Sequence, residues 1–148
     1  VVSPDMGGVV RARAMAKRIN AEIAIIDKRR EGPGVCDVMN IVGNIKGRHC
    51  VLLDDIVDSA GTLCNGARAL MDAGALSVQA YAIHGVLSGK AVENVMSSPL
   101  ESMVITDSIM AREDVAHCPK IRQVSIVPLL AEAIARTSEE RSVSCLFA

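Results

Sequence analysis

The chain has 148 residues and a formal net charge of −1, and half of its residues are hydrophobic. That length suits one domain with an aliphatic core, which needs neither disulfides nor a structural metal to fold. The near-neutral charge and the single Tyr, single Phe and missing Trp argue against nucleic-acid binding and against an acidic membrane surface, since both require a concentrated positive field. We therefore expect a small-molecule partner, with no nucleic acid and no membrane.

The cysteines indicate a reducing compartment. They are odd in number, lie far apart and show no Cys-x-x-Cys spacing, which is typical of reduced thiols and not of a disulfide framework or a zinc site. No apolar run reaches the ~18 residues needed to span a bilayer, and the start shows no signal peptide. We expect a cytoplasmic protein. The first residues lack an initiator Met and resemble the end of a strand, which predicts a start inside a longer protein.

Helical and β-branched segments alternate along the chain. In chain order, the pattern predicts an amphipathic helix over residues 8–20, a strand over 23–26, a second strand over 51–53 and a helix over 63–71 that stops before Gly74. Three further strands are expected at 78–83, 103–106 and 124–127. Repeated strand-helix-strand units predict a three-layer α/β fold, with a mostly parallel sheet and helices on both faces.

Residues 28–45 interrupt this alternation. Their charged and glycine-rich sequence predicts a long polar loop where a short crossover would be usual. Long loops in compact domains are often functional.

The sequence after the strand at 51–53 is suited to phosphate binding. Ligands of parallel sheets bind beyond the carboxyl ends of the strands. Small Ser59, Ala60 and Gly61 allow close approach of the backbone, and Thr62 opens a helix whose N-terminal dipole favours an anion. The alternative is that Asp58 or Ser59 simply caps that helix.

Two carboxylates precede this loop. Asp54 and Asp55 would lie within reach of sugar hydroxyls or of hydrated Mg²⁺, because carboxylates are hard acceptors suited to both.

Five segments together resemble one enzyme family. The run from Asp54 through Thr62 is similar to the signature of the type I phosphoribosyltransferase fold. With its companion motifs it resembles the phosphoribosyl pyrophosphate synthetase family, the ribose-phosphate diphosphokinases, over the whole chain. The companions are Ser3-Pro4-Asp5-x-Gly7-Gly8, Asp27-Lys28-Arg29-Arg30, His84-Gly85-x-x-Ser88-Gly89 and Ser142-Val143-Ser144-x-Leu146-Phe147.

The resemblance implies transfer of the pyrophosphoryl group of MgATP to O1 of ribose 5-phosphate, with AMP as the leaving group. Lys28 and Arg30 match the family's catalytic pair, and Asp5 matches a residue that binds Mg²⁺ at the ATP site; the alternative for Asp5 is a turn or helix cap. The implied ribose 5-phosphate contacts are Arg30, Asp54, Asp55, Asp58, Ser59, Ala60, Gly61 and Thr62. Ser142 and Ser144 match a regulatory site, or else belong to a polar tail. His84 is expected to be structural.

The resemblance also implies a missing part. It covers only the C-terminal half of the family's enzyme, so residues 1–148 are expected to be one phosphoribosyltransferase-like domain of a two-domain protein that forms a homo-oligomer at full length. The absent N-terminal half supplies adenine-binding residues in that family. Two other functions stay open: a phosphoribosyltransferase that consumes phosphoribosyl pyrophosphate, and a non-catalytic regulatory homologue of the synthetase.

Overall fold

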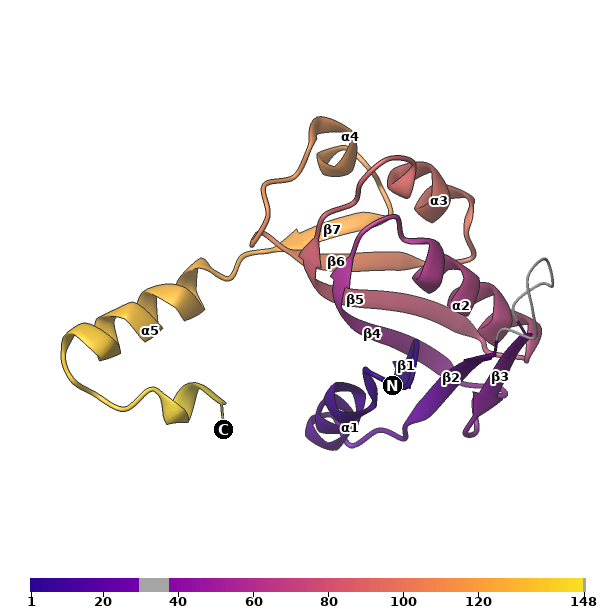
Figure 1. The fold of residues 1–148 in the computed structure, drawn as a ribbon, viewed down its shortest axis with the longest axis horizontal. Helices are drawn as coiled ribbons and strands as arrows, with labels where there is room; N and C mark the ends of the chain where they lie inside the picture. Colours follow the sequence, from indigo (N-terminus) through magenta and orange to yellow (C-terminus); the bar gives the residue numbers. More distant parts are fainter. Residues whose placement is uncertain (30–37, 148) are drawn as a thin grey trace.

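The computed structural model describes residues 1–29 and 38–147. Within this part of the chain, strands and helices alternate except over residues 24–57, where three strands follow one another (Figure 1). The strands are β1 (Val2–Ser3), β2 (Ala24–Arg29), β3 (Val38–Val42), β4 (His49–Val57), β5 (Ser77–Gly85), β6 (Ser102–Thr106) and β7 (Ile121–Val124). The helices are α1 (Val9–Arg18), α2 (Gly61–Asp72), α3 (Ala91–Ser97), α4 (Glu113–Ala116), α5 (Val127–Ser138) and the short 3₁₀ helix η1 (Ser144–Phe147).

The described strands form a single sheet in the order β3-β2-β1-β4-β5-β6-β7. Every neighbouring pair is parallel except β2 and β3, which pair in antiparallel fashion. Helices lie on both faces, with α2, α3 and α4 on one side and α1 on the other (Figure 1). The predicted α/β fold with a mostly parallel sheet is therefore confirmed.

The core lies between α2 and the centre of the sheet. Leu63, Ala67 and Leu70 of α2 are almost fully buried against the aliphatic side chains of β4 and β5. Helix and sheet approach closely at Gly66, where an added Cβ would lie 3.0 Å from Cδ1 of Ile26. The body is thus held by aliphatic packing, as the near absence of aromatic residues requires.

The second face of the sheet is only partly covered. α1 contacts β1 and β4, and beside it a cavity of about 340 Å³ is lined by Leu53, Tyr81 and Val104 among others. Ile83, another lining residue, is 45% exposed. Ile83 of β5 and Val124 of β7, which both line this cavity, therefore expose apolar side chains on this side of the sheet.

Two predictions of local structure were wrong. Residues 124–127 are not one strand: β7 ends at Val124 and α5 begins at Val127, because the apolar run continues across a strand-to-helix junction. Residues 28–45 are not simply a loop, since β2 extends to Arg29 and β3 begins at Val38. The antiparallel pair that they form was missed because the charged and glycine-rich residues 29–34 predict a loop, although β3 itself contains no charged residue.

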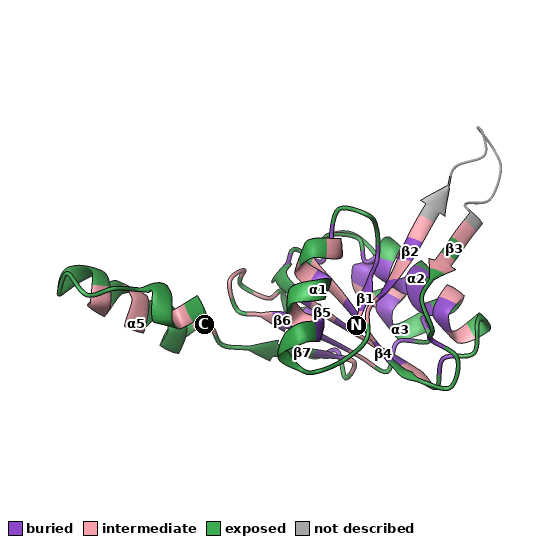
Figure 2. Cartoon of the chain, turned by 90° about the horizontal axis from the view of Figure 1, so that it is seen from below, coloured by how far each residue is buried: buried purple, intermediate pink, exposed green. Residues whose placement is uncertain are grey.

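The C-terminal arm, which we define as α5 and η1, extends away from the sheet (Figures 1 and 2). None of the residues of α5 is buried. Its connection to β7 is held by the Asp107 carboxylate, whose Oδ1 accepts a hydrogen bond from the Ile126 amide at 2.9 Å. At the far end, Nη2 of Arg18 donates to the carbonyl of Phe147 at 2.7 Å. No described helix is long and apolar enough to cross a membrane.

Four of the five cysteines lie in the described residues, and Cys36 lies outside them. In the described residues, Cys50, Cys64 and Cys118 are free and buried, and Cys145 is free and exposed. Burial raises the pKa of Cys50 and of Cys64.

Candidate functional site

A cavity of about 220 Å³ lies where β4 ends and α2 begins. It is at the carboxyl edge of the parallel strands, the edge at which such sheets bind ligands. Six of the residues predicted to bind the sugar phosphate line it: Asp54, Asp58, Ser59, Ala60, Gly61 and Thr62. Asp55 is not among its lining residues. The sequence thus predicted the position of this loop, and the structure adds that the loop lines a cavity.

The backbone of this loop has an unusual conformation. Ala60 lies in the left-handed region, with φ of 60°, immediately before α2, and it is buried. Left-handed conformations are costly for residues with a Cβ, and they persist where the surroundings enforce them, often at functional sites. An added Cβ at Gly61 would have a single neighbour within 4 Å, Oγ of Ser59 at 3.6 Å. Gly61 therefore faces open space.

The capping alternative for Asp58 and Ser59 does not hold. No side-chain hydrogen bond caps the N-terminus of α2. Asp58 instead accepts a hydrogen bond on Oδ1 from the hydroxyl of Ser88. The N-terminal dipole of α2 consequently has no side-chain partner from its own cap, which suits an anion at this position.

A second segment, which follows β5, is hydrogen-bonded to the loop between β4 and α2. After β5, the Ser88 amide donates to the Asp58 carbonyl at 3.1 Å, and Nδ2 of Asn94 in α3 donates to the Ser59 carbonyl at 2.9 Å. Leu87, immediately before Ser88 and fully buried, is also left-handed with φ of 49°. Ser88 belongs to a motif noted in the sequence, whereas Asn94 carried no signal. The backbone of the loop between β4 and α2 is therefore fixed by residues about thirty positions further along the chain.

The two aspartates are bound by an arginine that the sequence did not single out. Nη1 of Arg11, in α1, lies 3.0 Å from Oδ2 of Asp55, and Nη2 lies 3.9 Å from Oδ1 of Asp54. The sequence predicted an amphipathic helix over residues 8–20 and gave Arg11 no role in a site. Only the pairing of β1 with β4, which brings the start of α1 beside the aspartates, reveals the contact.

The environments of the two carboxyls differ. Desolvation, together with the neighbouring Asp55 and Asp5, raises the pKa of Asp54. At Asp55 desolvation is outweighed, because the hydrogen bond with Asp54 and the charge of Arg11 hold its pKa below the ordinary value. Adjacent carboxyls whose pKa values are pushed apart favour one ionised and one more readily protonated group.

Asp5 takes the turn role in the described structure. Its Oδ1 accepts a hydrogen bond from the Gly8 amide at 2.9 Å, and its carbonyl accepts one from the Ser3 hydroxyl at 2.7 Å. Gly8 is required there, since an added Cβ would lie 2.7 Å from Oγ of Ser3. No group of three or more His, Cys, Asp or Glu that could hold a metal occurs among the described residues. Asp5 could still contribute one carboxylate to a Mg²⁺ that also binds water and substrate phosphates.

None of the remaining predicted residues is among those that line the cavity in the described part of the chain. The backbone of Lys28 is in β2, opposite Met39 of β3, and Arg30 lies outside the described residues. Ser142 and Ser144 hydrogen-bond to one another in the arm, which projects from the body (Figure 1). His84, expected to be structural, bonds through Nδ1 to the Ser108 hydroxyl at 2.9 Å.

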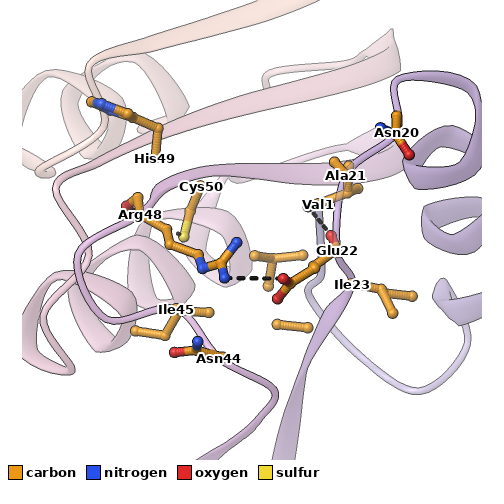
Figure 3. Close-up of a pocket in the computed structure, with 12 residues that line it drawn as sticks. Val1, Asn20, Ala21, Glu22, Ile23, Asn44, Ile45, Arg48, His49 and Cys50 are labelled. Atoms are coloured by element: carbon orange, nitrogen blue, oxygen red, sulfur yellow. Dashed lines mark hydrogen bonds and ion pairs between the residues drawn. The ribbon is translucent and has the colours of Figure 1, made fainter.

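A larger cavity, about 410 Å³, opens at the opposite edge of the sheet (Figure 3). Figure 3 shows Arg48 directed at Glu22, whose Oε1 lies 2.9 Å from Nη2 of Arg48, while the terminal amine of Val1 donates to the Glu22 carbonyl at 2.7 Å. This cavity lies at the amino ends of the strands and contains none of the predicted site residues. Its size alone therefore does not make it the functional site.

Comparisons with known proteins agree with the resemblance. Residues 33–148 match the family model described as phosphoribosyl synthetase-associated domain. The chain is 62% identical, over 99% of its length, to a protein of Caulobacter vibrioides named ribose-phosphate pyrophosphokinase, and 54% identical to a protein of the same name from Coxiella burnetii. It covers 47% and 46% of those relatives, so the chain spans about half of their length.

Solved structures give the same result. The crystal structure of phosphoribosylpyrophosphate synthetase from Mycobacterium smegmatis matches with a TM-score of 0.85 and 33% identity, covering 94% of this chain and 44% of that one. Orotate phosphoribosyltransferase from Aeropyrum pernix matches with a TM-score of 0.52 and 15% identity, covering 90% of this chain and 63% of that one. The second likeness is one of fold alone.

Proposed function

Because the chain belongs to the phosphoribosyl synthetase-associated domain family, we propose that it is the sugar-phosphate-binding part of a ribose-phosphate diphosphokinase. The complete reaction moves the pyrophosphoryl group of MgATP to O1 of ribose 5-phosphate and releases AMP. Phosphoribosyl pyrophosphate, the product, would serve nucleotide biosynthesis.

The observation that carries this proposal is the cavity lined by the loop between β4 and α2. Its cavity combines the N-terminus of a helix, which favours a phosphate, with the carboxylate of Asp54, which can accept hydrogen bonds from ribose hydroxyls. In this arrangement the 5-phosphate binds the backbone from Ser59 to Thr62, and the sugar extends toward β4. The cavity volume of about 220 Å³ suits a small ligand of this kind.

The transfer step requires positive charge at the phosphoryl oxygens. Lys28 and Arg30 would supply it, and Asp5 would bind the Mg²⁺ that accompanies ATP. Adenine recognition and part of the positioning of ATP would come from the other half of the enzyme. Since holding two reactants in attack geometry is worth about 7–11 kcal/mol of barrier, residues 1–148 alone should bind ribose 5-phosphate and have little diphosphokinase activity.

Calorimetric titration of the chain with ribose 5-phosphate tests the binding part. We expect saturable binding by the wild type and its loss in Gly61→Val, because position 61 faces open space and a larger side chain would enter the cavity. Asn65→Val is the matched control, since it places the same β-branched residue at an exposed position of α2 outside the cavity. Unchanged affinity in a folded Gly61→Val would remove the loop from the site.

AMP release tests whether residues 1–148 suffice for the chemistry. The chain is compared with a full-length ribose-phosphate pyrophosphokinase at saturating Mg²⁺, ATP and ribose 5-phosphate. A rate near that of the full-length enzyme would show that residues 1–148 suffice, contrary to this proposal.

A further inference from the structure

Arg11 occupies a position that its own helix does not favour. It is the third residue of α1, at the end of the helix where the dipole is positive, and the first turn contains no acidic residue. A cation there is unfavourable by a few tenths to about 1 kcal/mol. Its Nε atom is buried and has no hydrogen-bond partner, which adds a desolvation cost. Stability of α1 therefore does not explain the residue.

The contacts of Arg11 with Asp54 and Asp55 explain the presence of an arginine at this position better than helix stability does. Its guanidinium connects α1 to the acidic pair of β4, and it lies 3.0 Å from Asp55 and 3.9 Å from Asp54. The side chain of Arg11 is 36% exposed, that of Asp54 19% and that of Asp55 56%. The closer partner is thus the more exposed carboxylate, which is also the one that does not line the cavity.

Both oxygens of Asp55 are occupied. Oδ1 accepts a hydrogen bond from the Ile56 amide at 3.0 Å, and Oδ2 pairs with Arg11. The Asp55 amide in turn donates to Oδ1 of Asp54 at 2.9 Å. A chain of contacts therefore runs from Arg11 through Asp55 to Asp54, and only the last member faces the cavity.

We propose that the two aspartates have different tasks: Asp54 contacts the sugar directly, while Arg11 and Asp55 form a positioning pair that holds Asp54 in place. This inference rests on the proposed function, and it refines the sequence-based assignment, which gave Asp54 and Asp55 the same role. In a site of this kind a misplaced carboxylate weakens ligand binding without any loss of a direct contact.

Titration of the complete chain with ribose 5-phosphate tests the pair. Arg11→Gln and Asp55→Asn should each weaken binding by about tenfold, because each removes one partner of the ion pair and leaves the other charge unpaired. The double variant should be no weaker than either single variant, because the two residues act as one unit. Arg11→Lys should recover part of the affinity, since it restores the charge without the planar fork. Arg13→Gln, on the exposed side of the same helix, should bind like the wild type.

Each outcome is decisive. Losses that add in the double variant, or wild-type affinity in both single variants, would overturn the positioning pair and leave the proposed function intact. Absence of binding by the wild type would overturn both. Should Arg11→Gln fail to fold, Asp55→Asn decides the question, because the Asp55 side chain is more than half exposed. Wild-type affinity in Asp55→Asn would overturn the positioning pair. A loss of affinity in Asp55→Asn, with a smaller loss in Arg11→Lys, would support it.

Discussion

Helices α2 and α5 have the same length and a similar amphipathic character, yet their environments are opposite. Each has 12 residues. Five residues of α2 are buried against the sheet, whereas none of α5 is, and Ile134 on its apolar side is 69% exposed. An amphipathic pattern therefore predicts that a helix forms, but the connections of the chain decide what it packs against. The loop between β4 and α2 leads directly into the buried helix α2, so the geometry of this loop depends on the core.

The largest expected effect tests this contrast directly. Leu70→Ala removes a fully buried side chain of α2 and should lower the free energy of unfolding by about 2–5 kcal/mol. Ile134→Ala in α5, a comparable deletion, should change it by less than about 0.5 kcal/mol. Urea unfolding of both variants is the measurement. Equal losses would show that α5 is packed in solution, and the contrast between the two helices would then be wrong.

The difference between buried and exposed elements also explains which elements the sequence could predict. The strands expected at 51–53, 78–83 and 103–106 are confirmed within β4, β5 and β6, because buried parallel strands are short apolar runs. The position of the loop between β4 and α2 followed from the same rule. The end of β7 was misplaced because the apolar residues of α5 continue its pattern although they are exposed.

The contacts around the loop could not be predicted in this way. Arg11 and Asn94 reach the site from other elements, and nothing in their local sequence distinguishes them from exposed polar residues. Their roles depend on which strands are neighbours in the sheet. The order β1-β4-β5 places the start of α1 on one side of the loop and α3 on the other.

A smaller effect is expected at the end of β5, where the body is tightly packed. An added Cβ at Gly85 would lie 2.5 Å from Cδ1 of Ile105. Gly85→Ala should therefore cost about 1–3 kcal/mol through overpacking. Ile105→Val removes Cδ1, so the double variant should be more stable than the sum of the two single costs predicts. Strict additivity in urea unfolding would mean that this contact does not limit the packing.

The support of the loop by α3 should contribute less. Asn94→Ala removes the 2.9 Å hydrogen bond to the Ser59 carbonyl, and we expect a loss of about 0.5–1.5 kcal/mol of stability together with weaker ribose 5-phosphate binding. Asn65→Ala is the matched control and should leave binding unchanged, because Oδ1 of Asn65 accepts a hydrogen bond from Arg68 within α2. Equal affinities in the two variants would show that the loop holds its shape without α3.

The smallest effect concerns the root of the arm, where a single carboxylate fixes the connection between β7 and α5. Hydrogen bonds from the Ser125 hydroxyl and the Ile126 amide hold the pKa of Asp107 below its ordinary value, which is about 3.9 in unfolded peptides. A lowered pKa means that the carboxylate stabilises this connection above the unfolded value and loses that effect as the pH falls through the folded one. The amide proton of Ile126, followed by NMR, should therefore shift with a midpoint below about 3.9. Asp107→Asn keeps an acceptor oxygen but cannot ionise, so its Ile126 signal should show no such transition. A midpoint at or above the ordinary value in the wild type would mean that Asp107 does not hold the arm, and that the direction of α5 is set elsewhere in the chain.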